Sequence, residues 1–197
     1  MHPAREYRMT PDSQTYEYDF TLVLTGITEL TPGIAEGLLE AGCDDGTIAM
    51  RSGRPFITFS RRAPSIKDAI LSAIENVRNA NVGVGVLRVD YCNLVTQSDI
   101  ARKIGRSRQL VHQYMTAARG PGGFPAPACG IVDDVPLWYW CEVADWLWQN
   151  NMVKEGVLRD AEEVELINNV LELMRQKAMN PDLAAEVIKS ISPEICH

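Results

Sequence analysis

A short stretch at residues 96–115, TQSDIARKIGRSRQLVHQYM, constrains the fold of this chain more than any other feature. Thr96 and Asp99 have the spacing of a capping box, in which two residues at a helix start satisfy free backbone N–H groups. Gly105 is typical of a helix stop, and Ser107 is a typical cap for a second helix. The stretch therefore predicts two short helices joined by a tight glycine turn.

The spacing of small and aliphatic residues in this stretch predicts how the two helices cross. Ala101 leaves room on the first helix for a close crossing, and Gly105 tolerates the left-handed backbone of the turn. Val111 supplies a buried aliphatic side chain on the second helix, over residues 107–117. This combination is typical of a helix-turn-helix unit. We expect an interior made of Ile100, Ala101, Ile104, Leu110, Val111 and Tyr114.

The outward positions of the two helices are polar and basic. In the usual docking of such a unit, the start of the second helix enters the major groove of DNA. Arginine side chains pair with guanine and glutamine side chains with adenine. Basic side chains on the first helix and in the turn contact phosphates. The alternative is an ordinary helical hairpin with a solvated basic face. We expect phosphate contacts from Arg102, Lys103 and Arg106, and base contacts from Ser107, Arg108, Gln109, His112 and Gln113.

The charge of the chain is unevenly distributed, which supports the DNA-binding interpretation. The net charge is -7 overall. Residues 91–132 nevertheless hold five bases and a single acid, Asp99, for +4. Residues 1–90 carry -3 and residues 133–197 carry -8. The acidic net charge of the whole chain therefore conceals a basic segment that lies between two acidic ones.

A predicted β-hairpin follows the second helix. The stretch ARGPGGFPAP begins near Arg119 and is rich in glycine and proline, and the stretches ACGIV and PLWYW read as two short strands. A hairpin in this position is a wing, which lies along a phosphate strand or a minor groove. Asp133 and Asp134 stand at its tip, where acids would repel phosphate. We therefore expect contacts from Arg119, Gly122 and Gly123 rather than from the tip.

The segment GGFPAP…LWYWCEVADWL resembles the excisionase-like branch of the MerR-type winged helix-turn-helix superfamily over roughly residues 94–148. The residues that carry the resemblance are Phe124, Pro125, Pro127, Trp138, Trp140, Val143, Trp146 and Leu147. The resemblance implies that Phe124, Trp138 and Trp146 are core residues of the wing. The close spacing of the four tryptophans also favours packing over a ligand cage. The whole chain further resembles a group of small bacterial helix-turn-helix proteins with a βαββαβ segment in front.

The sequence of residues 16–91 predicts a βαββαβ domain in front of the helix-turn-helix unit. Two helices are expected, one capped by Thr31 and stopped by Gly42, the other capped by Ser65. Four strands alternate with them, and Ser52-Gly53 predicts a two-residue hairpin. The order β-α-β-β-α-β is the ferredoxin-like pattern. The stretch VGVGV lacks the phosphate-loop spacing and reads as a buried strand.

The C-terminal region, residues 151–197, reads as helical. An apolar stripe of Val164, Ile167, Leu171 and Met174 opposes a strongly acidic face. Pro181 begins a last short helix. The stripe fits pairing with a second copy or packing on its own chain, and the pattern does not choose between these.

The fold class expected is therefore α+β: a flexible N-terminus (1–15), a ferredoxin-like domain (16–91), a winged helix-turn-helix domain (92–150) and a helical C-terminus (151–197). Thr96 and Gln97, at the start of the first helix, complete the candidate DNA-binding residues. Five scattered cysteines and three distant histidines form no disulfide framework or metal pattern, so no metal or cofactor and a cytoplasmic location are expected. No apolar run reaches the roughly 18–20 residues of a membrane span.

The function expected is sequence-specific binding of double-stranded DNA by a transcriptional regulator acting as a homodimer. One alternative is an antitoxin-like module whose acidic C-terminal helices bind a protein partner and whose DNA binding is autoregulatory. Another is a ligand-sensing regulator with an effector site in residues 16–91. The carboxylate pairs Glu36–Glu40 and Glu162–Glu165 have the spacing of solvated helix faces, and no nucleophile–base set is present, so an enzyme is not expected.

Overall fold

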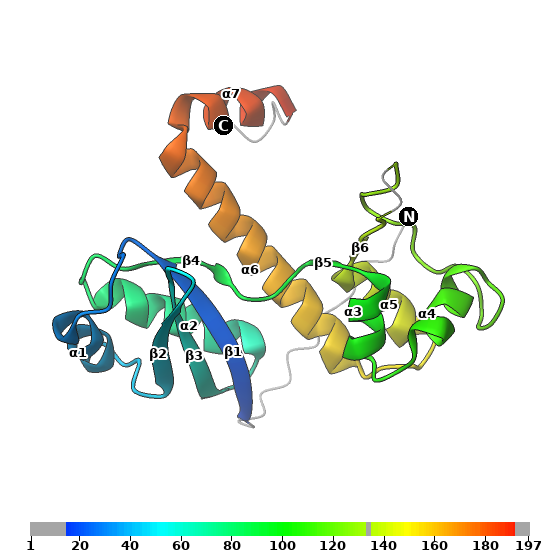
Figure 1. Ribbon diagram of the computed structural model, residues 1–197, viewed down its shortest axis with the longest axis horizontal. Coiled ribbons are helices and arrows are strands. Elements are labelled where there is room, and N and C mark those ends of the chain that lie inside the picture. Colours follow the sequence, from blue (N-terminus) through cyan, green and yellow to red (C-terminus); the bar gives the residue numbers. More distant parts are fainter. Residues whose placement is uncertain (1–14, 133–134, 192–197) are drawn as a thin grey trace.

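The computed structural model describes residues 15–132 and 135–191, which form the α+β fold expected from the sequence (Figure 1). The chain divides into a sheet lobe (residues 16–91) and a tryptophan lobe (residues 92–150), with a long helix between them. The elements are β1 (Tyr16–Thr25), α1 (Pro32–Glu40), β2 (Gly46–Arg51), β3 (Arg54–Ala63), α2 (Ile66–Asn79), β4 (Gly85–Val89), β5 (Leu94–Val95), α3 (Gln97–Lys103), α4 (Arg108–Met115), β6 (Trp138–Tyr139), α5 (Trp140–Gln149), α6 (Glu155–Met179) and α7 (Pro181–Ile191).

The sheet lobe contains a four-stranded antiparallel sheet in the order β2-β3-β1-β4. The hairpin between β2 and β3 turns at Ser52 and Gly53, whose φ angles of 52° and 73° are those of the two-residue turn that suits twisted strands. The two helices begin where the sequence predicts, because Thr31 and Ser65 accept hydrogen bonds from Ile34 and Asp68. These local signals therefore place the hairpin and both helices.

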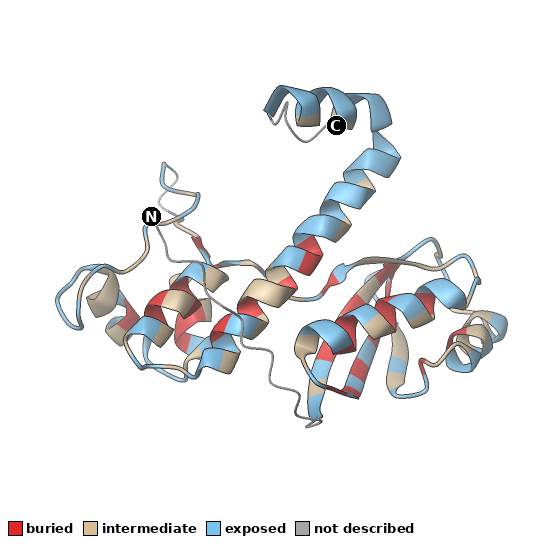
Figure 2. Ribbon diagram, turned by 180° about the vertical axis from the view of Figure 1, so that it is seen from behind, coloured by how far each residue is buried: buried red, intermediate tan, exposed pale blue. Residues whose placement is uncertain are grey.

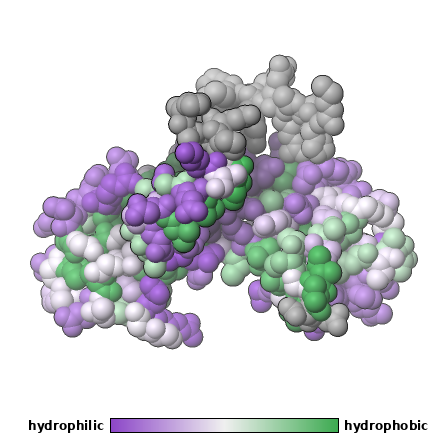
Figure 3. All heavy atoms as spheres, turned by 90° about the horizontal axis from the view of Figure 1, so that it is seen from above, coloured by the Kyte–Doolittle hydropathy of each residue, from purple (hydrophilic) through white to green (hydrophobic). Residues whose placement is uncertain are grey.

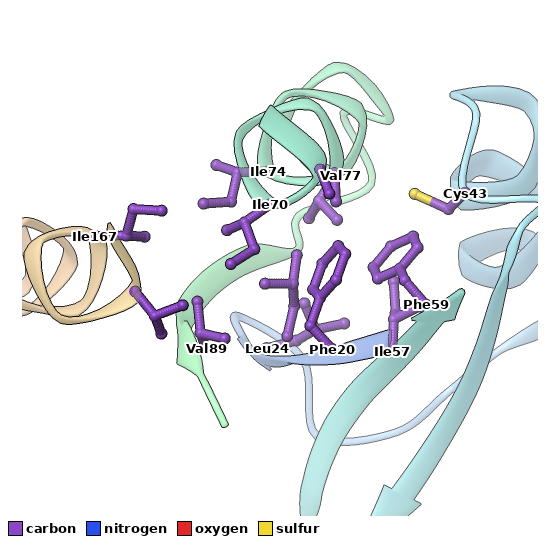
Figure 4. Packing of buried hydrophobic residues seen from close by; sticks show 14 of the residues in the cluster. Phe20, Leu24, Cys43, Ile57, Phe59, Ile70, Ile74, Val77, Val89 and Ile167 are labelled. Atoms are coloured by element: carbon purple, nitrogen blue, oxygen red, sulfur yellow. The ribbon is translucent and has the colours of Figure 1, made fainter. Parts of the chain in front are cut away.

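One face of this sheet is buried under the helices. Alternate residues of β1 and β3 point to the same face, and these are large and apolar. They meet the apolar stripe of α2, as Figure 4 shows for Phe20, Phe59, Ile70 and Val77. Helix α1 contributes Leu38 to this core, whereas the neighbouring Leu39 is 47% exposed.

A buried arginine interrupts the apolar pattern of β3. Arg61 is 8% exposed and forms a two-pronged ion pair with Asp45, both contacts being 2.7 Å. Its remaining N–H groups donate to the Ser72 hydroxyl, to the Asn76 side-chain oxygen and to the carbonyl of Gly42. Arg61 thus ties the loop after α1 to α2 and leaves no donor of its guanidinium idle in the core.

The tryptophan lobe has a second core, built from α3, α4 and α5. Ile100, Val111, Val143 and Leu147 are fully or almost fully buried in it. A short antiparallel pairing of β5 with β6 closes the lobe, and the N–H of Trp140 donates to the carbonyl of Asn93. The two ends of the lobe are therefore joined by backbone hydrogen bonds as well as by packing.

Helix α6 belongs to both cores. Leu158 and Ala161 pack into the tryptophan lobe, whereas Val164 and Ile167, two turns further on, pack into the sheet lobe. Figure 2 shows buried residues on the first half of α6 and exposed residues on its last turns. The predicted stripe therefore packs on its own chain only in part, since Met174 is 57% exposed.

Asn168 fastens α6 to the edge strand β4. Its side-chain oxygen accepts from the N–H of Val89 at 2.8 Å, and its side-chain nitrogen donates to the carbonyls of Val89 and Tyr91 at 3.2 and 3.1 Å. Asn168 is only 6% exposed. It takes the place of a neighbouring strand at the end of β4, where an unpaired edge would otherwise be buried.

The projecting end of the molecule, which we call the arm (residues 169–191), consists of the last turns of α6 and all of α7. Pro181 begins α7, as the sequence predicts. Figure 3 looks down on the arm and shows hydrophobic residues exposed along it. No helix within the described residues is both long and apolar enough to cross a membrane. The N-terminus expected to be flexible is residues 1–15, and all of it except Thr15 lies outside the described residues.

Candidate nucleic-acid interface

The two helices predicted from residues 96–115 are present, and side-chain caps define where each begins. Thr96 accepts from the N–H of Asp99, and the Asp99 carboxylate accepts in return from the N–H and the hydroxyl of Thr96. Ser107 caps α4 by accepting from the N–H of Leu110. The hydroxyls of Thr96 and Ser107 are therefore engaged within the protein, and the second helix is Arg108–Met115 rather than 107–117.

The turn between α3 and α4 is tight and well bonded. Gly105 has a φ of +63°, the left-handed conformation that glycine adopts without strain. The N–H of Arg106 donates to the carbonyl of Ala101 at 2.9 Å, and the Gln97 side chain donates to the carbonyl of Arg108 at 2.8 Å. Gln97 thus joins the two helices and is already occupied in the free protein.

The expected interior of the helix pair is largely confirmed. Ile100, Ala101 and Val111 are buried, and Ile104 and Tyr114 pack against them while remaining partly accessible. Leu110 is only half-buried. The small side chain of Ala101 and the buried Val111 therefore lie where the close crossing of the two helices requires them.

The outer surface of α4 brings several predicted base-reading residues together. Arg108, Gln109 and His112 lie on the first two turns of the helix and are exposed, whereas Gln113 is half-buried. Arg106, in the turn just before, is also exposed. The start of α4 thus presents a compact set of donors and acceptors to the solvent.

Arg102 lies on the exposed side of α3, where it pairs with Asp99 at 2.6 Å. Hydrogen bonds from the hydroxyl and backbone of Thr96 hold the pKa of Asp99 below its usual value, with a further contribution from Arg102. The arginine is largely exposed, so this is a surface ion pair of small energetic weight. A phosphate group could exchange with Asp99 for the same guanidinium at little cost.

Lys103 is placed differently from the other basic residues of α3. Its ammonium lies 4.0 Å from the centre of the Tyr91 ring and 4.9 Å from that of Trp140, close enough for cation–π attraction. Partial withdrawal from water lowers its pKa. Lys103 therefore joins α3 to the rings behind it, and it would have to leave them to reach a phosphate.

An aromatic cluster fixes the segment that follows α4. The ring of Phe124 meets Trp138 and Trp146 edge-on at centroid distances of 6.4 and 5.0 Å, and Tyr114 lies 5.4 Å from Trp146. The indole N–H groups of Trp138 and Trp146 donate to the carbonyls of Pro125 and Gly122. The two tryptophans are buried and Phe124 is half-buried, so all three are packing residues, as the resemblance implies.

The expected wing is a much smaller feature than two paired strands. A single bridge joins Cys129 to Leu137, supported by hydrogen bonds between their backbones and from Val135 to Gly130. The other expected strand shortens to β6, which pairs with β5 rather than with residues 128–132. The predicted acidic tip, Asp133 and Asp134, lies outside the described residues.

The remaining predicted contacts lie in the segment between α4 and this bridge. Arg119 is exposed, and its N–H donates to the carbonyl of Gln113, which keeps it beside the end of α4. Gly123 is exposed, whereas Gly122 is half-buried under Trp146. A Cβ at Gly120 would approach the Tyr114 ring to 3.0 Å, so this glycine allows the segment to turn closely against α4.

Two features of this region were not predicted from the sequence. The pairing of β5 with β6 joins segments more than forty residues apart, and each strand is only two residues long. The position of Lys103 over two rings depends on Tyr91, which precedes the expected domain boundary. Within the described residues no group of three His, Cys, Asp or Glu side chains is placed to hold a metal ion.

No model of a protein family, no curated protein and no solved structure matches this chain. What the surface of α3 and α4 binds is therefore proposed from its geometry and charge.

Proposed function

We propose that this protein is a transcriptional regulator that binds double-stranded DNA through α3 and α4, with α4 in the major groove. The observation that carries the proposal is the crossing at Ala101 and Val111, which turns Arg108, Gln109 and His112 outward together. A helix held in this way by a second helix is the usual reader of base edges. A cytoplasmic location is part of this proposal.

The finer architecture belongs to the same proposal. The order β2-β3-β1-β4 is the one expected for a ferredoxin-like sheet, and the bridge at Cys129 is consistent with a short wing behind the helix pair. We assign phosphate contacts to Arg102, Arg106 and Arg119, whose side chains are exposed. Lys103 is assigned a supporting role, because its ammonium already lies over two rings.

The arm supports a dimer. One helix-turn-helix unit reads few base pairs, and such proteins usually bind two half-sites as dimers. Large exposed hydrophobic residues mark interaction sites when they lie close together. Those of the arm and the turn before it are Leu166, Val170, Leu173, Met174, Met179, Leu183, Val187 and Ile191. Light scattering on the purified chain would measure a mass of two copies if they pair with a second copy.

A protein partner is the second candidate for the arm, as in an antitoxin-like module. The observation that favours it is the same exposed apolar set combined with the acidic charge of residues 133–197. A basic partner that co-purifies with the chain, and is lost when Leu173 and Leu183 are changed to lysine, would support this candidate. A monomer in solution that captures no partner would count against both uses of the arm.

DNA binding is tested by fluorescence anisotropy, first with random duplex at several salt concentrations. The three phosphate contacts assigned to each chain would lower the affinity by about 40-fold when salt rises from 50 to 200 mM. A specific site is then selected from genomic fragments. On that site, Arg108→Ala with Gln109→Ala is expected to cost about 2–4 kcal/mol and to relax sequence preference.

Arg78→Ala is the matched control, because Arg78 is an exposed arginine on α2 in the sheet lobe. It removes one positive charge without touching α3 or α4 and is expected to leave the affinity within about twofold. Failure to bind any duplex even at low salt would refute the proposal. If Arg78→Ala lowered the affinity for DNA as much as Arg108→Ala with Gln109→Ala, the assignment of α4 as the reading helix would be refuted.

A further inference from the structure

A groove of about 840 Å³ lies between the sheet lobe and the overhanging end of α6. Thr25 and Arg54 line it from the ends of β1 and β3, and residues 86–88 line it from β4. The opposite wall is the side of α6 from Asn168 to Met179. In Figure 1 this part of α6 climbs away from β4 toward α7. The volume lies within the range of small-molecule sites, roughly 300–1,000 Å³.

The charged lining of the groove is predominantly positive. It contains three arginines, Arg54, Arg88 and Arg175, and a single carboxylate, Glu172. Arg175 holds that carboxylate with two hydrogen bonds of 2.6 and 2.8 Å. The bonds from Arg175 and Gln176 lower the pKa of Glu172 to about 2, with a contribution from the charge of Arg88. Glu172 and Arg175 therefore compensate each other, and Arg54 and Arg88 remain.

Backbone groups orient Arg88. Its Nε donates to the carbonyl of Val89 at 3.2 Å and one terminal nitrogen donates to the carbonyl of Tyr91 at 2.9 Å. Neither Arg88 nor Arg54 forms an ion pair with a carboxylate of the described residues. Two arginines at one groove, one of them held in place, form a site that attracts an anion.

The rest of the lining is apolar or amide. Leu171, Met174 and Met179 of α6 and Val86 and Leu87 of β4 supply its apolar part. Beside them, the side-chain oxygen of Asn93 is buried and accepts no hydrogen bond among the described residues. The groove thus offers an apolar surface together with Arg54 and Arg88, a combination that fits an organic anion rather than a bare ion.

We propose that this groove binds a small organic anion, in which a carboxylate, sulfonate or phosphate is attached to an apolar body. Arg54 and Arg88 hold the anionic group, and the side chains of β4 and α6 cover the body.

The position of the groove also suggests what binding would do. Its walls belong to the sheet lobe and to α6, and α6 packs into the tryptophan lobe through Leu158 and Ala161. A ligand that bridges β4 and α6 stabilises the helix that supports the proposed DNA-binding unit. The regulatory role rests on the proposed function, whereas binding of the anion does not.

The test compares two fluorescent probes that differ in charge. The first is 8-anilinonaphthalene-1-sulfonate, an anion with an apolar body, and the second is N-phenyl-1-naphthylamine, which has nearly the same body without the sulfonate. Each is titrated into the full chain without DNA, so that failure of the proposed function leaves this result untouched. Saturable binding of the anionic probe is expected.

The variants separate charge recognition from general hydrophobic binding. Arg54→Ala with Arg88→Ala is expected to weaken binding of the anionic probe about tenfold and to leave the neutral probe within twofold. The control, Arg62→Ala with Arg78→Ala, removes two exposed arginines of the same lobe. It is expected to leave the affinity for both probes unchanged. Arg54→Ala alone provides a second variant that spares the backbone contacts of Arg88, and circular dichroism verifies that each variant is folded.

Three outcomes would overturn the proposal. The first is no saturable binding of the anionic probe to the unaltered chain. The second is an equal loss for both probes in the groove variants, which would mean that only hydrophobic contact had changed. The third is an equal loss in the control variant, since the probe would then respond to total charge rather than to this groove.

Discussion

The attachment of α6 to β4 through one buried amide leads to a sharp prediction for Asn168→Leu. Leucine has the branching and the number of side-chain heavy atoms of asparagine, so the change removes hydrogen bonds without leaving a cavity. Three hydrogen bonds to Val89 and Tyr91 are lost. The loss in the free energy of unfolding is nevertheless smaller than three lost hydrogen bonds would suggest.

The carbonyls of Val89 and Tyr91 keep other donors. The Val89 carbonyl accepts from the N–H of Tyr91 at 2.7 Å and from Arg88, and the Tyr91 carbonyl also accepts from Arg88. In the Asn168→Leu variant only the N–H of Val89 loses its partner. Val89 is 2% exposed, so this N–H stays buried without a hydrogen bond. An orphaned buried donor costs about 1–3 kcal/mol, so we expect a loss of about 2 kcal/mol in the free energy of unfolding.

Urea unfolding measures this loss. With a denaturant dependence of about 2 kcal/mol per molar, the midpoint is expected to fall by about 1 M. The four tryptophans all lie in residues 138–148, so their fluorescence reports the tryptophan lobe although Asn168 contacts the sheet lobe. Because α6 packs into both cores, fluorescence and circular dichroism are expected to shift together.

Asn169→Leu is the matched control, since Asn169 is the exposed neighbour on the same helix and is expected to change stability by less than about 0.5 kcal/mol. A similar loss in both variants would show that the buried bonds of Asn168 are not the cause. A shift in circular dichroism without a shift in fluorescence would refute the coupling of the two lobes through α6.

Three further predictions concern single side chains. Arg61→Met is expected to cost about 3 kcal/mol in urea unfolding, against less than 0.5 for the exposed Arg62→Met, because a buried ion-pair network loses its cation. Asp99→Asn is expected to lower the melting temperature at pH 7. Because folding lowers the pKa of Asp99, the difference should close as the pH falls below about 3.9, and a constant difference would contradict this. Burial, followed by the Glu165 carboxyl, raises the pKa of Cys141 to about 12, so iodoacetamide at pH 8 should label the exposed Cys92 and spare Cys141, as mass spectrometry of peptides would show.

The sequence predicts features of this fold that depend on neighbouring residues. The caps at Thr31, Ser65, Thr96 and Ser107 all form, because a cap needs only a side chain and the N–H groups that follow it. The Ser52-Gly53 hairpin forms for the same reason. The candidate surface on α4 is also mostly local, since helical periodicity decides which residues face outward.

The features that escaped prediction depend on contacts between distant segments. The periodicity of α6 marks Val164 and Ile167 as buried but does not reveal that Leu158 packs in another lobe. Lys103 looks like any basic residue of a helix until Tyr91 and Trp140 lie beneath it. The groove combines arginines from β3, β4 and α6, which no local pattern associates.

The double membership of α6 has a consequence for synthesis of the chain. Translation proceeds from the N-terminus, so the sheet lobe emerges from the ribosome before α6 does. Its core lacks Val164 and Ile167 until then, and the end of β4 lacks Asn168. The nascent sheet lobe therefore exposes an apolar edge while some seventy further residues are made.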